Sequence, residues 1–225
     1  MTPMAIEMYR VRKLCVTGLL FSVTPALLAA QAVPAGATVG RSPVRITATM
    51  GGIAPRRALI VDPLGGGDTR LGAAPAFGLE LQVDAVGAAS VFAGVGIAFT
   101  TLTHGTNLGV VARGVASDAS VVVGTGGLFL EAPSSLFGSA FRPTLRLGGG
   151  VKRYSFSTPG STAFLAPSGD VGGGFRTGGG DFELSAEVRY LPSAFDQAKL
   201  PVRGIVAQKQ QQRDLLFGIG VTVRP

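Results

Sequence analysis

The stretch that most clearly decides the fold is Phe182-Glu183-Leu184-Ser185-Ala186-Glu187-Val188-Arg189-Tyr190. Every second residue in it is apolar, and the residues between them are polar or charged. A second stretch, Phe77-Gly78-Leu79-Glu80-Leu81-Gln82-Val83-Asp84, has the same alternation. Because successive side chains of a β-strand point to opposite faces, this period of two predicts strands with one apolar face and one polar face.

Two β architectures fit such strands, and the composition of the chain favours one of them. A soluble sandwich turns the apolar face inward, whereas a barrel in lipid turns it outward and directs the polar face into the lumen. With a mean hydropathy of +0.40 and only 15% charged residues, the chain is too apolar for an ordinary water-soluble domain. After residue 32 no apolar run is long enough for a helix to span a bilayer. We therefore predict an all-β, closed, up-and-down antiparallel transmembrane barrel.

Residues 1–32 have the pattern of a signal peptide for export. A basic segment at 10–13 precedes an apolar run at 14–29, and Ala30-Gln31-Ala32 supplies the small-x-small cleavage pattern. A retained membrane anchor is the alternative interpretation, but Pro25 interrupts a run that is already short for a span. We predict cleavage after residue 32.

About eight strands are predicted in the remaining residues 33–225, which we interpret as one barrel domain. The expected strands are 44–52, 76–86, 90–100, 120–130, 141–154, one ending near residue 176, 181–191 and 214–224. The connections after even strands are shorter than those after odd strands, which are rich in Gly, Pro, Ser and Gln. Short periplasmic turns and long external loops are typical of up-and-down outer-membrane barrels. The sorting of connection lengths therefore supports the barrel over the sandwich.

If the apolar residues face lipid, the polar ones line the lumen. The predicted lumen residues carry both charges: Arg45, Glu80, Asp84, Arg146, Lys152, Arg176, Glu183, Glu187 and Arg189, with Gln82 and Ser185 among them. An eight-stranded barrel is just wide enough to be filled by side chains, and buried charges need partners. Mixed signs favour an internal salt-bridge network, while simple solvation in a wet lumen is the alternative. We also expect an arginine at Gln82, Ser185 or Thr222 to cost less than one on the lipid face at Leu81, Ile97 or Val188.

Glycine runs at 148–150 and 172–174 lie inside predicted strands, where glycine normally weakens a strand. In a small closed barrel they relieve crowding and permit coiling. A phosphate-binding loop is the rival interpretation, but 148–153 has no Walker spacing and no following helix.

Several other function classes find no support in the sequence. Cys15 is the only cysteine and falls in the predicted signal peptide, which excludes disulfides and Cys-bound metal from the exported chain. No carboxylates are spaced as a Ca²⁺ loop. The formal charge of +7 is scattered rather than gathered in a basic stripe with aromatics, which argues against nucleic acid as a partner. We expect no metal and no cofactor.

Three stretches in the second half carry a family likeness. They are Arg142-Pro143-Thr144-Leu145-Arg146-Leu147-Gly148-Gly149-Gly150-Val151-Lys152-Arg153-Tyr154, Glu183-Leu184-Ser185-Ala186-Glu187-Val188-Arg189-Tyr190 and Leu216-Phe217-Gly218-Ile219-Gly220-Val221-Thr222-Val223. They resemble the small outer-membrane β-barrel proteins of Gram-negative bacteria, the broad OmpA-like and OmpW-like group of eight-stranded barrels. The resemblance implies the outer membrane as location far more firmly than it implies an activity.

The last of these stretches looks like the C-terminal assembly signal of such barrels. Gly218, Val221 and Val223 match it, whereas Leu216 occupies a usually polar position and the chain ends in 223–225 without the usual aromatic. The partners implied are outer-membrane lipid and lipopolysaccharide, and the barrel-assembly machinery. We expect a monomer.

One group of residues suggests chemistry. His104 and Thr106 could act as base and nucleophile, with Asp118 as orienting carboxylate. This distantly resembles the His-x-Ser-Asn motif of lipid A deacylases, which are also eight-stranded barrels, although Thr replaces Ser and the motif comes earlier in the chain. We place His104 and Asp118 in a predicted external loop and favour a loop histidine without catalytic function.

The sequence therefore predicts a non-enzymatic outer-membrane barrel with a polar plugged lumen and a structural or surface-interaction role. A narrow channel for small solutes is the first alternative. A lipid A deacylase-like enzyme is the second.

Overall fold

The computed structural model describes residues 42–56, 60–61, 68–85, 87–105, 117–132, 141–157, 163–179, 181–196 and 209–225. The segment 1–32, for which we predict a signal peptide, lies outside these residues. No helix in the described ranges is long and apolar enough to cross a membrane.

Ten strands account for most of the described chain. They are β1 (Val44–Pro55), β2 (Ile60–Val61), β3 (Asp68–Leu71), β4 (Ala74–Asp84), β5 (Ala89–Gly105), β6 (Ser117–Glu131), β7 (Phe141–Phe156), β8 (Phe164–Gly179), β9 (Phe182–Asp196) and β10 (Lys209–Val223).

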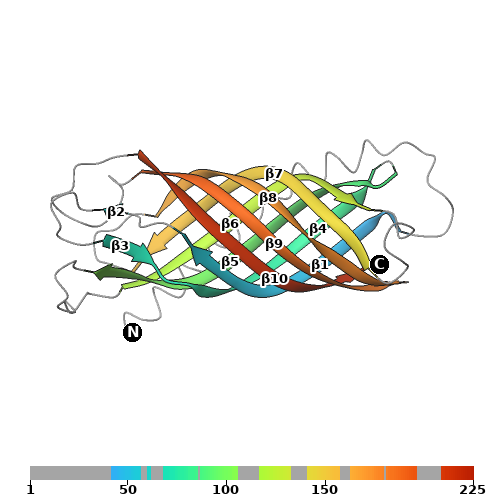
Figure 1. Ribbon diagram of the computed structural model, residues 1–225, viewed down its shortest axis with the longest axis horizontal. Helices are drawn as coiled ribbons and strands as arrows, with labels where there is room; N and C mark the ends of the chain where they lie inside the picture. Colours follow the sequence, from blue (N-terminus) through green and yellow to red (C-terminus); the bar gives the residue numbers. More distant parts are fainter. Residues whose placement is uncertain are drawn as a thin grey trace, which may run out of the picture.

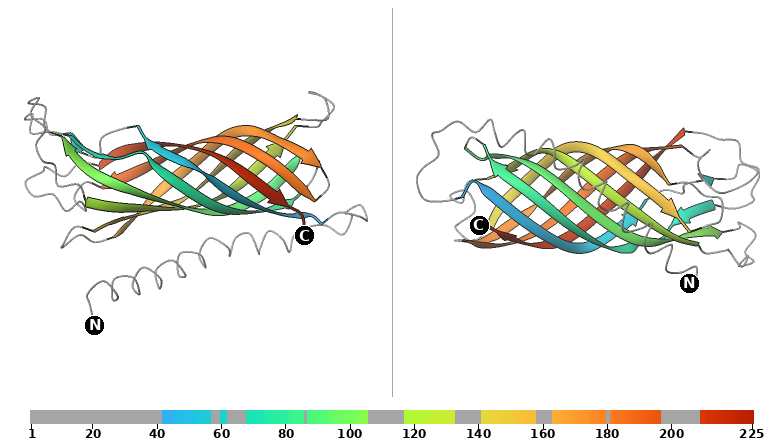
Figure 2. Two further views of the ribbon diagram at one scale, coloured as in Figure 1. Left: turned by 90° about the horizontal axis from the view of Figure 1, so that it is seen from below. Right: turned by 180° about the vertical axis from the view of Figure 1, so that it is seen from behind.

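Eight of these strands close into an antiparallel barrel in the order β1-β4-β5-β6-β7-β8-β9-β10, and β10 pairs back onto β1 (Figure 1). Apart from the short β2 and β3, neighbours in the barrel are neighbours along the chain, so the topology is up-and-down. Figure 2 shows the same cylinder from two further sides. The predicted closed barrel of about eight strands is confirmed.

The register fixes the stagger of the barrel. The path of paired residues around the barrel runs from Val44 through Val83, Val91, Leu128, Leu147, Val171, Tyr190 and Leu215 to Ala54. One circuit thus returns to β1 ten residues further on. Such a stagger requires strands tilted by about 35–45° to the barrel axis. The tilt is plain in Figure 1.

The two ends of the barrel differ in the length of their connections. β4 and β5, β6 and β7, and β8 and β9 are joined at the end where β1 begins and β10 stops, which we call the short-turn end. The mark C in Figure 1 lies there. The other connections, including the one containing β2 and β3, belong to the opposite end, which we call the long-connection end. Three of them are the longest in the barrel, whereas the β7–β8 connection at 157–163 is shorter than the β6–β7 connection at 132–140.

The outer wall of the barrel is apolar. On β9 the side chains of Phe182, Leu184 and Val188 are 67%, 59% and 55% exposed, whereas Glu183 between them is 4% exposed. The other strands repeat this pattern, with exposed large hydrophobic residues that include Met50, Leu79, Phe99, Leu128, Leu147, Phe175, Phe217 and Ile219. An apolar exterior and a polar interior is the arrangement of a barrel in lipid.

The observed strands agree with the predicted ones except at their ends and in one connection. The sixth predicted strand corresponds to β8. The three valines 121–123 lie on β6, where Val121 and Val123 are buried and Val122 between them lies on the outer face. Residues 53–75 were predicted as a connection, but they contain β2 and β3. β5 continues to Gly105 and so extends past the residues that pair with β4. The extra part of β5 pairs with β3. This pairing satisfies backbone groups that would otherwise be left open.

Glycines allow neighbouring strands to pack closely in part of the barrel wall. Gly126 and Gly127 of β6 pair with Gly149 and Gly148 of β7, and Gly149 pairs in turn with Gly169 of β8, whereas the run 172–174 lies opposite 144–146. A Cβ built on Gly150 would collide with the backbone carbonyl of Gly124. The glycine runs therefore permit close strand packing, and 148–153 lies within a strand rather than in a phosphate-binding loop.

Replacing Gly150 by Ala is expected to lower the free energy of unfolding by about 1–3 kcal/mol, the usual cost of overpacking. The matched control is Gly179→Ala on β8, where an added Cβ has no heavy atom within 4 Å. Urea unfolding of the refolded protein in detergent would compare the two. Equal stability of both variants would contradict the crowding explanation.

Candidate functional site

The lumen holds the main concentration of charged side chains in the described chain. At the short-turn end lies a set that we call the mouth cluster: Arg45, Asp84, Glu131, Arg142, Arg176, Glu183 and Arg224. Its centre is Glu131, whose carboxylate lies 2.7 Å from Nη1 of both Arg45 and Arg142 and 3.1 Å from Nη1 of Arg176. Four cations and three carboxylates give the mouth cluster a formal charge of +1.

A second set, the middle cluster, lies deeper in the barrel and consists of Glu80, Arg146, Asp170, Glu187 and Arg189. Arg146 reaches three carboxylates, with Glu80 at 2.9 Å, Asp170 at 3.0 Å and Glu187 at 3.1 Å. Arg189 lies 2.6 Å from Asp170. Two cations and three carboxylates give this cluster a formal charge of −1, opposite to that of the mouth cluster.

Gln82 joins the two clusters. Its Nε2 donates to Glu80 at 2.7 Å, and its Oε1 accepts from Nη2 of Arg176 at 3.0 Å. Gln82 and Thr222 are both fully buried, and the Thr222 hydroxyl lies 2.8 Å from that of Thr47. An arginine at Gln82 or Thr222 would break a buried hydrogen bond in a filled space, so we expect a cost there too, and the comparison with the lipid face stays a prediction.

Aromatic rings pack against the guanidinium groups of both clusters. Phe92 lies beneath Arg146, 4.1 Å from guanidinium carbon to ring centroid, and Phe129 lies beneath Arg176 at 4.8 Å. Desolvated cation–π contacts of this kind are worth about 2 kcal/mol or more. The rings also exclude water from one face of each cation.

Towards the long-connection end the lumen becomes apolar. This apolar layer consists of Ile53, Leu71, Ala74, Ala76, Ala98, Leu102, Ala119, Val121, Val123, Tyr154, Phe164, Ala166, Leu191 and Leu216. The rings of Tyr154 and Phe164 stack across it at 5.2 Å between centroids. The expectation of a polar plug throughout is therefore corrected, since apolar side chains fill this part of the lumen.

A single ion pair lies within the apolar layer. Lys152 is fully buried and its Nζ lies 2.6 Å from Oδ2 of Asp214, while Gln212 donates to the other carboxylate oxygen at 3.0 Å. Lys152 also donates to the carbonyl of Leu191 at 2.5 Å. The pair is fully desolvated, and removing either partner would leave an uncompensated buried charge.

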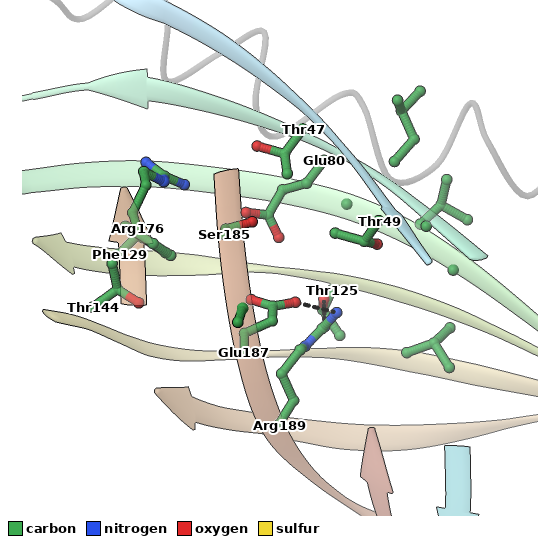
Figure 3. Close-up of a pocket in the computed structure, with 17 residues that line it drawn as sticks. Thr47, Thr49, Glu80, Thr125, Phe129, Thr144, Arg176, Ser185, Glu187 and Arg189 are labelled. Carbon is green, nitrogen blue, oxygen red and sulfur yellow. Dashed lines mark hydrogen bonds and ion pairs between the residues drawn. The ribbon is translucent and has the colours of Figure 1, made fainter. Parts of the chain in front are cut away.

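Little open space remains between these side chains. A cavity of about 20 Å³ is lined by Thr47, Thr49, Thr125, Glu187, Arg189 and neighbouring residues, which is room for about one water molecule (Figure 3). Glu187 and Arg189 extend from β9 into this space in Figure 3. A wider space of about 330 Å³ opens at the short-turn end beside Arg45, Asp84 and Arg142.

The structure places all nine lumen residues named from the sequence on the inner face, and it adds others that pair with them. The added charged residues are Glu131, Arg142, Asp170, Asp214 and Arg224. Across the described lumen, seven acidic and seven basic side chains form one balanced set. Of the two alternatives for this lumen, the geometry is that of a salt-bridge network rather than of separately solvated charges.

The signal for the added residues was present in the alternation of the strands. Asp170 has the same parity as Arg176 on β8, and Asp214 the same parity as Thr222 on β10. Glu131 was assigned to a connection because the predicted strand stopped one residue before it. Arg224, which follows the end of β10, lies 3.4 Å from Asp84 in the mouth cluster.

The residues considered for catalysis fall on two strands and on a segment outside the described residues. His104 belongs to β5, opposite Thr69 of β3, and Asp118 belongs to β6, where it is exposed and paired with Thr101. The prediction of a loop position is therefore wrong for both, because β5 and β6 extend further than expected. Thr106 lies outside the described residues.

The remaining site predictions concern metal and the assembly signal. No group of three or more His, Cys, Asp or Glu side chains in the described ranges is arranged to hold a metal ion. Gly218, Val221 and Val223 lie on β10, with Val221 exposed on the outer wall and Leu216 buried in the apolar layer. The unusual leucine at 216 thus fills the lumen.

Comparison with known proteins identifies the fold only. No protein-family model matches the chain, and no curated protein matches it. Among solved structures, the outer membrane protein AlkL, determined by solid-state NMR in lipid bilayers, is 17% identical, covers 84% of this chain and 93% of its own, and has a TM-score of 0.51. OprG from Pseudomonas aeruginosa is 13% identical, with 82% and 98% coverage and a TM-score of 0.49.

A third solved structure, Neisserial surface protein A, is 14% identical, with 83% and 99% coverage and a TM-score of 0.46. At these identities the likeness concerns the path of the backbone. The closed register and the apolar outer wall of this chain independently require a lipid surround. In fold, the chain is therefore a small closed eight-stranded β-barrel similar to that of AlkL, and its apolar outer wall is that of a barrel in a membrane.

Proposed function

We propose that the protein is a closed, non-conducting outer-membrane barrel with a structural or surface-interaction role. The observation that supports this is the filling of the lumen over its described length. The mouth cluster, the middle cluster and the apolar layer follow one another along the axis, and each is built from side chains of several strands.

The three layers resist ion flow in different ways. Arg146 and Asp170 are almost completely buried, so water does not separate the charges of the middle cluster. The polar side chains in the described part of the apolar layer already have partners: Lys152 pairs with Asp214, the Tyr154 hydroxyl bonds Ser193, and Thr100 donates to the carbonyl of Gly72. An ion would therefore have to break buried pairs and then cross a dry constriction, of the kind that closes channels by dewetting.

The refolded protein is expected to show no steady conductance in planar bilayers. Arg146→Ala opens space only in the middle cluster, so we expect this variant to stay closed as well, because the apolar layer above it is unchanged. Large ion-selective currents from the unmodified protein would contradict the proposal and favour a narrow channel for small solutes. Currents from Arg146→Ala alone would show that the apolar layer does not seal the lumen.

We also propose that the protein is not an enzyme. Asp118, the carboxylate predicted to orient His104, is exposed on the outer face of β6. Incubation with lipid A is expected to release no acyl chains. Release that disappears in both His104→Ala and Thr106→Ala would overturn this proposal, whereas release that persists in both variants would come from a contaminant.

The partners that suit this proposal are lipids rather than soluble molecules. The apolar wall fits lipid acyl chains, and β10 offers Gly218, Val221 and Val223 to the barrel-assembly machinery. Lipopolysaccharide is the expected neighbour at the long-connection end, which we orient to the outside by the length of its connections. We propose a monomer without nucleic-acid contacts.

A further inference from the structure

Two arginines face each other on the outer wall, where β10 closes onto β1. The backbone N–H of Arg56 donates to the carbonyl of Arg213 at 2.7 Å, directly beyond the pair of Pro55 and Asp214. Ile53 is buried in the lumen, so the alternation of β1 directs Arg56 outward, and its side chain is exposed. Arg213 lies next to the buried Asp214, so it too belongs to the outer face.

This juxtaposition needs an explanation, because directly opposed residues have Cβ atoms about 4.5–5.5 Å apart and like charges there are destabilising. Neither arginine takes part in an ion pair within the described ranges. The Nε atom of Arg213 is buried and has no hydrogen-bond partner there. Two arginines on opposed backbone positions can both turn their guanidinium groups to one anion with several oxygens, such as a phosphate.

The arginine pair lies at the border of the apolar wall that is nearer the long-connection end. On β10 the outward residues below Arg213 are Leu215, Phe217, Ile219 and Val221, and Phe217 and Ile219 are 53% and 62% exposed. On β1 the outward series below Arg56 includes Met50 and Ile46, both exposed. A molecule bound here would have its charged part beside the guanidinium groups and its apolar part against this wall.

We propose that Arg56 and Arg213 form a binding site for the phosphate of a phosphorylated lipid in the outer leaflet, with the acyl chains packed along β1 and β10. The charge complementarity selects the phosphate, and the apolar surface directly below selects a lipid over a free anion. The inference rests on the proposed location and orientation of the barrel, and it identifies one lipid contact of that barrel.

The test titrates diphosphorylated lipid A into the refolded full chain in uncharged detergent and measures binding through the increase in resistance to urea. Hydrogen bonds to charged groups are strong enough that Arg56→Gln/Arg213→Gln is expected to weaken the apparent affinity by about tenfold or more. The matched control is Arg153→Gln on β7, an outward arginine at the same border that pairs with Val122 and Leu165 instead of a second arginine. It is expected to change the affinity by less than about threefold.

Two further probes separate the ligand chemistry. Dephosphorylated lipid A is expected to bind wild-type protein and the double variant equally. Inorganic pyrophosphate is expected to bind wild-type protein much more weakly than diphosphorylated lipid A does. Equal affinity of wild-type protein and the double variant for diphosphorylated lipid A would overturn the site, and equally strong binding of pyrophosphate would overturn the lipid as its ligand.

Charge reversal gives a test that does not depend on loss of folding. Arg213→Glu places a carboxylate opposite Arg56, so the variant is expected to resist higher urea than wild type without lipid, and to lose the response to diphosphorylated lipid A. Destabilisation of this variant without lipid would show that Arg213 already has a carboxylate partner in the chain, which would overturn the proposal. Conductance measured on the same variants reports separately on the closed lumen, since neither arginine faces it.

Discussion

Replacing Arg146 by Met is expected to lower the free energy of unfolding by about 3–5 kcal/mol, the usual effect of removing one partner from a buried ion pair. Methionine keeps most of the volume of the side chain but leaves Glu80, Asp170 and Glu187 without their shared cation. Only Arg189 remains near them, 2.6 Å from Asp170. Urea unfolding of the refolded barrel, followed by the loss of its β-sheet circular dichroism signal, would measure the change.

Arg153→Met is the matched control for this prediction, because Arg153 lies on the outer face of β7 and has no ion pair among the described residues. Its replacement is expected to change the free energy of unfolding by less than about 1 kcal/mol. A similarly small effect at Arg146 would mean that water screens the middle cluster. In that case the interpretation as a desolvated salt-bridge network would be wrong.

The second large effect is expected on the lipid face. Val188→Arg introduces a charge near the middle of the apolar wall of β9, which costs about 2–4 kcal/mol at the bilayer midplane. Phe182→Arg makes the same kind of change on the same strand and face, but at the short-turn end. There the expected charge cost falls to about 0–1 kcal/mol.

Equilibrium unfolding in lipid vesicles, rather than in detergent micelles, would measure this difference, because only a bilayer imposes a depth. A larger cost at Val188 than at Phe182 would support the placement of the membrane. Equal costs at both positions would mean that the apolar wall does not span a hydrocarbon layer in the way we describe.

The fold was predictable because a strand encodes its faces with a period of two. The stretch 182–190 defines an apolar and a polar face without reference to any other part of the chain, and the structure confirms both faces of β9. The charged lumen residues followed from the same parity. Arg45, Glu80 and Arg146 come from three different strands, yet their inward direction is a local property of each strand.

The parts that could not be predicted depend on relations between strands. Ile53 and Leu216 are apolar, as lipid-facing residues are, but they point into the lumen. They belong to the apolar layer because the stagger of the strands places them at the same level along the barrel axis. The pairing of β3 with the end of β5 likewise depends on how far β5 outlasts its neighbour β4. The site at Arg56 and Arg213 requires the closure register between the first and last strands.

The mouth cluster has a consequence for the order in which the barrel forms. Asp84 of β4 contacts Arg45 of β1 and Arg224 at the end of the chain, 140 residues away in sequence. Glu183 of β9 likewise contacts Arg142 from β7 and Arg45 from β1. The contacts of Asp84 with Arg224 and of Glu183 with Arg45 require β10 to have reached β1, so an open sheet of the first seven barrel strands leaves part of its charge without partners. Bringing distant segments together is intrinsically slow, and here it is also the step that neutralises the lumen. Insertion into the bilayer and closure are therefore expected to occur together, because a half-closed sheet would expose unpaired charges to hydrocarbon.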